Sequence, residues 1–278
     1  IQQIRKMGVE DRTLIVITAD HGESFGEHGE QTHGFFIYDA TTHAPLIIRC
    51  PVLLPAKNKR VSTLVRSVDI FPTVLELLSI SHYGKIHGSS LVPLISGEGS
   101  WTAKYSYSEA FIPRNYNWSE LKGLRGEGWK YIEAPKPELY DLKNDPRELI
   151  NLFETKKVKA LELKKSLKEL ESGEKAAQSE RMPLDQETIE RLKSLGYLHA
   201  GGDPTGEEEK TEEMTVRRDP KDMIRVLRKF QRANSLSDKG EFASAEGLMK
   251  QVIEADPENS RFRVALGNML LDRMKLDE

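Results

Sequence analysis

One short stretch constrains the fold of this 278-residue chain more than any other, an apolar run that stops abruptly at polar residues. Residues 13–18 read Thr-Leu-Ile-Val-Ile-Thr, and Ala19 and Asp20 follow at once. A run that is apolar on both faces and β-branched is typical of a central parallel strand covered by helices on both sides. The residues after it, "DHGESFGEHGEQTHGFF", are then expected at the carboxyl end of that strand, where ligands bind in open α/β sheets.

The next segments continue an α/β pattern. A second strand is expected over residues 45–49 ("PLIIR"), and the apolar spacing of residues 67–80 predicts a helix. From residue 105 to about 142, short strand-like pieces alternate with Pro, Asn and Gly, which favours a small antiparallel sheet. The fold class predicted for this part is therefore α/β with an appended antiparallel sheet.

The last third of the chain has a different character. Residues 201–213 carry six acidic residues and no apolar residue, so they cannot bury a core and are predicted to be a linker. Beyond them Ala233 and Leu236 recur as Gly267 and Leu270 at a period of 34, which is typical of tetratricopeptide repeats. The predicted division is a first domain over 1–154, a helical extension over 155–200, an acidic linker over 201–216 and an all-α repeat segment over 217–278.

Composition excludes several classes of partner. The net charge is only −3, which gives no electrostatic case for nucleic acid or for an anionic membrane surface. No apolar stretch approaches the roughly 18 to 20 residues that cross a bilayer. The single cysteine, Cys50, has no partner for a disulfide and no metal-ligand spacing around it, so we interpret it as a core residue.

The residues after the first strand favour cation binding. Asp20 and His21 are adjacent, and Gly22 lets the backbone turn sharply after them. A carboxylate and an imidazole presented together can ligate a hard or borderline cation. Two ligands do not fill a coordination sphere, so further ligands have to come from elsewhere. His33 and Gly34 follow a glycine-rich turn in which His28 is expected to shape the backbone.

These residues resemble the sulfatases of the alkaline phosphatase superfamily. The family pattern is a strand, Asp-His-Gly or Asp-Asn-Gly, a Gly-Glu/Asp-His-Gly turn, Lys-Gly or His-Gly, a Tyr and a Pro-Leu-Ile strand. It reads here "ITADHGESFGEHGEQTHGFFIYDATTHAPLIIRCP". Further matches are "SVDIFPTVLELL", "HGSSLVPLISGE", "WKYIEAPKPELYDLKNDPRELINL" and "RLKSLGYL", in the family's order over about residues 1–198. The fold implied is the C-terminal part of an alkaline-phosphatase-like sandwich, followed by tetratricopeptide repeats.

The resemblance implies roles for four residues. Asp20 and His21 become ligands of a divalent metal, with Ca²⁺ as the first expectation and Mn²⁺ or Zn²⁺ as alternatives. His33 takes the place of a basic residue that contacts the sulfuryl group or protonates the departing oxygen, and His43 is a candidate substrate contact. The implied substrate is a sulfate ester of a small molecule or a glycan. The repeats imply a protein partner, and the family's habit is periplasmic, extracellular or membrane-associated.

The chain also departs from the family. Neither the family's first pair of metal-binding aspartates nor its Cys/Ser-x-Pro-x-Arg nucleophile is present, and Cys50 lacks that setting. We therefore expect the C-terminal half of a catalytic domain with no nucleophile of its own. Arg125 and Lys130 are expected to be solvated or paired structural residues, and His82, His87 and His199 ordinary surface residues.

Two other functions remain open from the sequence. One is phosphoryl chemistry in the same superfamily, by a phosphodiesterase or phosphonate hydrolase or by a phosphoethanolamine transferase, whose loop is close to "DHGES" followed by Gly-Glu and His-Gly. The other is a non-catalytic scaffold, because tetratricopeptide arrays build concave surfaces for peptides.

Overall fold

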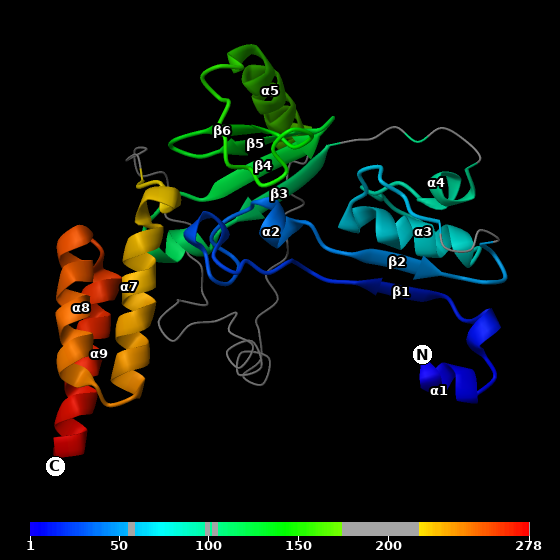
Figure 1. Cartoon of the computed structure of the whole chain (residues 1–278). Helices are drawn as coiled ribbons and strands as arrows, with labels where there is room; N and C mark the ends of the chain where they lie inside the picture. The colour runs from blue at the N-terminus through cyan, green and yellow to red at the C-terminus, as the bar shows by residue number, and fades with distance from the viewer. Residues whose placement is uncertain (55–58, 98–100, 102–104, 174–216, 278) are drawn as a thin grey trace. The chain divides into compact units, whose positions relative to one another are not determined.

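The computed structural model describes residues 1–277 except 55–58, 98–100, 102–104 and 174–216 (Figure 1). The chain forms two compact units. The first contains residues 1–109, 122–133 and 137–163, and the second contains residues 110–121, 134–136 and 164–278. The acidic linker, most of the helical extension, the "RLKSLGYL" motif and His199 lie outside the described residues. The predicted domain boundaries remain a prediction.

The first unit begins with two strands that pair with each other. Helix α1 (Gln2–Lys6) ends before Gly8, whose φ of +67° suits a glycine. Strand β1 (Ile15–Thr18) then pairs with β2 (Leu46–Arg49), with Ile15 opposite Arg49 and Thr18 opposite Leu46. The predicted strands are thus present.

The prediction of a central parallel strand was wrong for the described residues. β1 and β2 are antiparallel, and Ile17 and Ile47 are 44% and 56% exposed. The connection explains the direction, because the chain turns back through the short helix α2 (Asp39–Thr42) and enters β2 beside the strand it left. An uninterrupted apolar run does not by itself tell a parallel strand from an antiparallel one.

A helical layer follows β2. Residues 67–69 form a 3₁₀ turn that leads into α3 (Ile70–Leu77), and α4 (Val92–Ser96) comes after it. Asp69 is fully buried and holds this region together, because its carboxylate pairs with Arg66 at 2.6 Å and accepts the amide of Ser89 at 2.9 Å. The predicted helix is confirmed.

The predicted antiparallel sheet is also confirmed, in the order β3-β4-β5-β6 (Figure 1). Its strands are β3 (Ser106–Ala110), β4 (Leu121–Gly126), β5 (Trp129–Glu133) and β6 (Glu138–Asp141). Leu124, Tyr131, Ile132 and Leu139 have no exposed surface, so the sheet has an apolar core of its own. Helix α5 (Lys157–Gly173) begins after it and buries Leu163 and Leu167 completely.

Three helices make up most of the described part of the second unit. They are α7 (Pro220–Asp238), α8 (Phe242–Ala255) and α9 (Ser260–Asp277), with α8 packed against both neighbours. Asp219 caps α7 by accepting the amide of Lys221 at 2.9 Å. The C-terminal segment is therefore helical in its described part. None of the described helices is both long and apolar enough to cross a membrane.

The residues between β3 and β4 belong to this helical unit. Tyr116 and Trp118 pack with Phe230 of α7 and Phe262 of α9, with ring centroids 5.0 to 6.4 Å apart. The indole nitrogen Nε1 of Trp118 donates to Asp256 at 2.9 Å, in the turn between α8 and α9. Asp256 is buried, so a loop that leaves the sheet supplies both ring surface and a hydrogen bond to the helical core.

We expect Trp118→Phe to destabilise the helical unit by about 1–2 kcal/mol, because ring packing is kept while Asp256 loses a buried donor. Denaturant unfolding followed by circular dichroism measures this change. Trp129→Phe is the matched control, because Trp129 lies in the sheet and is only half-buried. Equal unfolding midpoints for the two variants would contradict the expectation.

Candidate active site in the histidine loop

The candidate site lies in the connection between β1 and β2, residues 19–45, called here the histidine loop. Its first part is fixed against α2. The amide of Gly22 donates to the carbonyl oxygen of Thr41 at 2.8 Å, and a Cβ at position 22 would collide with the carbonyl group of Ala40. Only glycine allows this approach. The position of Asp20 and His21 at the end of β1 therefore depends on the position of α2.

Asp20 and His21 present one carboxylate and one imidazole nitrogen to the same region. Nδ1 of His21 contacts the carbonyl oxygen of Gly22 at 2.8 Å, so Nδ1 carries the proton and Nε2 keeps its lone pair. Nε2 lies 3.7 Å from Oδ2 of Asp20, while Oδ1 of Asp20 accepts the amide of His21 at 3.0 Å. The Asp20 side chain is 74% exposed, which leaves the carboxylate accessible.

His33 lies beside this pair, and an acidic residue orients it. Its ring centroid is 3.9 Å from that of His21, and its Nδ1 is 3.0 Å from Oε2 of Glu23. The carboxylate accepts the Nδ1 proton, so the second ring nitrogen, Nε2, is left to face a ligand. The sequence indicated His33 but not Glu23, although the acidic residue two positions after His21 was a visible signal. The structure thus brings together Asp20, His21 and His33.

His43 is placed differently. It follows α2, its amide donates to the carbonyl oxygen of Asp39 at 2.9 Å, and its side chain is exposed. That side chain makes no hydrogen bond or ion pair with a described residue. Its role as a substrate contact therefore stays a prediction.

A buried carboxylate, which the sequence did not reveal, holds the segment around His33. Glu30 is 2% exposed and accepts the amides of Phe35 at 2.8 Å and Phe36 at 3.2 Å. Burial raises the pKa of Glu30 to about 7. The hydroxyl of Ser24 donates to the Glu30 carbonyl oxygen at 2.9 Å, so both sides of the turn are tied together.

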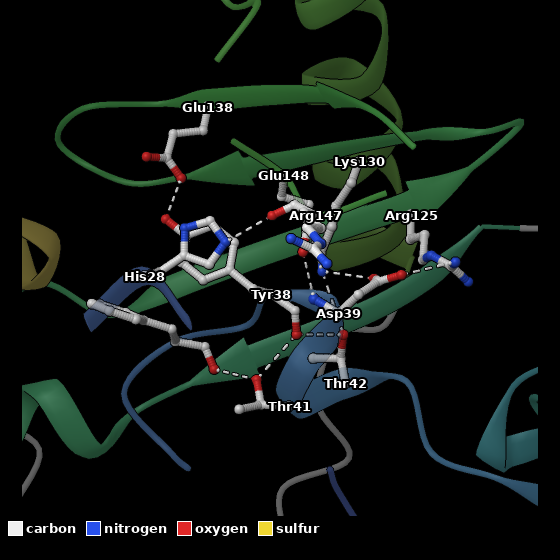
Figure 2. A network of polar contacts seen from close by, with 11 residues as sticks. His28, Tyr38, Asp39, Thr41, Thr42, Arg125, Lys130, Glu138, Arg147 and Glu148 are labelled. Atoms are coloured by element: carbon white, nitrogen blue, oxygen red, sulfur yellow. Dashed lines mark hydrogen bonds and ion pairs between the residues drawn. The ribbon is translucent and has the colours of Figure 1, made fainter. Parts of the chain in front are cut away.

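His28 shapes the turn, as predicted. Its φ is +52°, and its ring stacks on Tyr38 with centroids 3.5 Å apart (Figure 2). Nε2 of His28 contacts the carbonyl oxygen of Arg147 at 3.1 Å. Burial lowers the pKa of His28, which favours the neutral ring. This histidine therefore belongs to the support of the loop.

The donor set can be tested against a divalent cation. Asp20 and His21 offer an oxygen and a nitrogen 3.7 Å apart, a separation that suits two ligands each about 2.0–2.6 Å from one cation. Among the described residues, no cluster of three or more His, Cys, Asp or Glu side chains could hold a metal ion. The pair has the geometry to serve as part of a ligand set for a cation.

The fold and the loop together define an α/β domain of the alkaline-phosphatase-like type with a sulfatase-like histidine loop. Residues 26–173, more than half of the chain, match the family described as N-sulphoglucosamine sulphohydrolase, C-terminal. The chain belongs to this sulfatase family. Asp20 and His21 lie just before the matched residues, and His33 and His43 lie within them.

Individual relatives agree with this assignment. The chain is 32% identical to arylsulfatase K of Xenopus laevis over 184 residues, which cover 61% of this chain and 33% of the relative. A solved structure in complex with its substrate, D-glucosamine-2-N,6-O-disulfate, is similar with a TM-score of 0.56 and 30% identity, over 65% of this chain and 38% of that one. The phosphonate monoester hydrolase of Agrobacterium radiobacter is similar with a TM-score of 0.55 and 26% identity, over 67% of this chain and 40% of that one. The chain thus spans about a third of the length of the first relative.

Replacing Glu30 by Gln tests the buried carboxyl group. Because the folded pKa of about 7 lies above the usual 4.5, the folded chain keeps a proton that the unfolded chain has lost. The contribution of Glu30 to the free energy of unfolding is therefore full below pH ~4.5 and is lost as the pH rises through 7. Glutamine does not titrate, so the free energy of unfolding of Glu30→Gln should not fall in this pH range as that of the wild type does. We expect the free energy of unfolding of the variant, relative to that of the wild type, to rise by up to about 3 kcal/mol between pH ~4.5 and 8.

Denaturant unfolding at several pH values measures this difference. His28 contributes with the opposite sign, because its pKa is lowered, but it is present in both proteins and cancels. Glu76→Gln is the control, since Glu76 is exposed. A stability difference that does not change with pH would show that the Glu30 carboxyl group does not titrate as described.

Proposed function

We propose that this chain forms part of the active site of a metal-dependent sulfuric ester hydrolase. The observation that carries the proposal is the group formed by Asp20, His21 and His33, with the two imidazole rings 3.9 Å apart and Glu23 behind the second ring. Membership of the sulfatase family supports sulfate ester hydrolysis as the reaction. Because the chain spans about a third of its relative, the remaining parts of the site are assigned to residues outside it.

In this proposal Asp20 and His21 hold a divalent cation, with Ca²⁺ as the first candidate and Mn²⁺ or Zn²⁺ as alternatives. The carboxylate favours the hard cations, and the imidazole favours Mn²⁺ or Zn²⁺. When bound, such a cation would supply positive charge that polarises the reacting ester. The proton on Nδ1 of His21 is held by the carbonyl oxygen of Gly22, which keeps Nε2 free to act as a ligand.

His33 is proposed as the proton donor to the departing oxygen. The Glu23 carboxylate holds Nδ1, so that Nε2 can carry and release the proton. No nucleophile is assigned to this chain. Cys50 is buried at the end of β2 and lies outside the histidine loop.

The proposed substrate is a sulfate ester of a small molecule or a glycan. The structure of the relative bound to a glucosamine disulfate supports a sulfated sugar. His43 is proposed as a further substrate contact, because its exposed side chain follows α2 directly.

Phosphoryl or phosphonate chemistry is a second candidate, because a phosphonate monoester hydrolase has a similar structure. Comparing kcat/KM for an aryl sulfate with that for the matching aryl phosphonate, in the protein that carries this chain, separates the two. A clear preference for the phosphonate would overturn the sulfatase proposal.

The helical segment is proposed to be a tetratricopeptide-like repeat that binds a protein partner. Its three described helices and the 34-residue period support this assignment. A repeat that recruits a partner is compatible with an enzymatic first unit.

We expect Asp20→Ala to lower bound metal and activity together, because one of the two proposed ligands is lost. Elemental analysis of the purified protein measures the metal independently of turnover. Asp11→Ala is the matched control, since Asp11 is an exposed aspartate near β1. Equal metal content in Asp20→Ala and wild type would refute the ligand role.

His33→Ala is expected to lower kcat by about 10²- to 10⁴-fold for esters with poor leaving groups, and by less for esters with good ones. The reason is that only a poor leaving group needs a proton as it departs. Glu23→Gln should show the same trend more weakly. Rates over a series of aryl esters measure the dependence, with His82→Ala as the control on the exposed surface. An equal loss for all esters would leave His33 as an anion-binding residue only.

A further inference from the structure

A lysine buried in the antiparallel sheet is the strongest feature that the proposed mechanism does not use. Lys130 lies on β5 with only 1% of its side chain exposed. Its Nζ is 3.0 Å from Oδ1 of Asp39 and 2.9 Å from Oε1 of Glu148 (Figure 2). Placing a charge in the interior is costly unless it is paired, so the two carboxylates account for its burial. The sequence predicted a solvated or paired residue, and the pairing is confirmed.

Both carboxylates lie at the start of α2, because Asp39 is its first residue and Glu148 binds the backbone of Asp39. Oε2 of Glu148 accepts the amide of Asp39 at 2.6 Å, and Nη2 of Arg125 donates to Oδ2 of Asp39 at 3.0 Å (Figure 2). Glu148 is 2% exposed, and burial raises its pKa while the neighbouring Lys130 lowers it. The start of α2 is thus held on its side chain by two cations and on its backbone by a carboxylate.

The other end of α2 contacts the candidate active site. The backbone carbonyl oxygen of Thr41 accepts a hydrogen bond from the amide of Gly22 at 2.8 Å. The carbonyl group of Ala40 lies so close that no side chain fits at position 22. The hydroxyl of Thr41 donates to the carbonyl oxygens of Phe36 at 2.9 Å and Tyr38 at 3.1 Å, which ties α2 to the segment after His33. A displacement of α2 would therefore move Gly22, and His21 with it.

We propose that Lys130, Asp39 and Glu148 form a positioning cluster for the metal-binding pair, which acts through α2 and Gly22. The proposal rests on the function proposed above for Asp20 and His21. None of the three touches the proposed ligands, so they are positioning residues and not catalytic residues. The sheet does not depend on the cluster alone, because it has a separate apolar core that includes Leu124 and Tyr131.

Lys130→Met in the 278-residue chain tests the proposal, since methionine keeps much of the volume and removes the charge. The first readout is amide proton exchange by NMR. Loss of the cluster should raise exchange at Gly22 by about tenfold, while exchange in the paired strands β5 and β6 changes much less. The second readout is paramagnetic broadening of the His21 signals by added Mn²⁺. Half-broadening should need about tenfold more Mn²⁺ than in wild type, in line with the usual effect of removing an outer-shell partner.

Two controls separate positioning from general stability. Lys156→Met removes an exposed lysine and should change neither readout. Leu124→Ala creates a cavity in the core of the sheet and should raise exchange in β5 and at Gly22 together. The proposal is overturned if Lys130→Met raises amide exchange in β5 and at Gly22 in the same ratio as Leu124→Ala does. It is also overturned if exchange at Gly22 is unchanged.

If Lys130→Met does not fold, Glu148→Gln is measured in its place. It keeps an oxygen for the amide of Asp39 but removes the charge that faces Lys130. The same selective rise in amide exchange at Gly22 supports the proposal, and a uniform rise or no change overturns it.

Failure of the function proposed for Asp20 and His21 gives a different result from failure of the positioning cluster. Mn²⁺ would then leave the wild-type His21 signals unbroadened, while amide exchange would still decide whether the cluster positions Gly22.

Discussion

The close approach of Gly22 to α2 is the constraint on which the rest of the candidate site depends. The two segments are brought so near that the amide of Gly22 and the carbonyl oxygen of Thr41 share a hydrogen bond of 2.8 Å. This contact sets where the chain leaves β1, and the direction in which Asp20 and His21 project follows from it. The glycine after the histidine is therefore required by packing, because any larger residue would separate the proposed metal ligands from the helix that supports them.

Apolar burial and polar contacts hold this loop together. Residues 35–38 of the loop are buried apolar residues, whereas the two short strands that the loop connects are partly exposed. Glu30 satisfies two backbone amides beside His33, and Glu148 satisfies the first amide of α2. Because buried polar groups are costly when unpaired, each such bond specifies one arrangement and penalises others. Preorganisation of this kind is what a site for a charged reaction needs.

Local sequence patterns and the family resemblance predicted part of the fold and part of the candidate site. They located both strands that flank the histidine loop, the antiparallel sheet and the three residues that the structure brings together. They predicted a parallel strand at residues 13–18, whereas β1 pairs with β2 in the antiparallel direction in the part of the chain that the structure describes, because an apolar run does not identify the partner strand. They did not reveal the pairing of Lys130 with Asp39 or of Glu148 with the amide of Asp39, since these partners are 91 and 109 positions apart. Contacts at such separations follow from the fold as a whole, and no short motif encodes them.

The loop between β3 and β4 is a second case in which contacts between distant residues could not be predicted from the sequence. Residues 110–121 lie inside the sulfatase family match, yet they are part of the compact unit that contains α7, α8 and α9. Trp118 is 1% exposed, and its partner Asp256 is 5% exposed in the turn between α8 and α9. A boundary placed at the acidic linker would cut this core, because Phe230 and Phe262 would lose the aromatic surface of Tyr116 and Trp118. The helices α7 and α9 therefore share a core with residues that lie inside the family match.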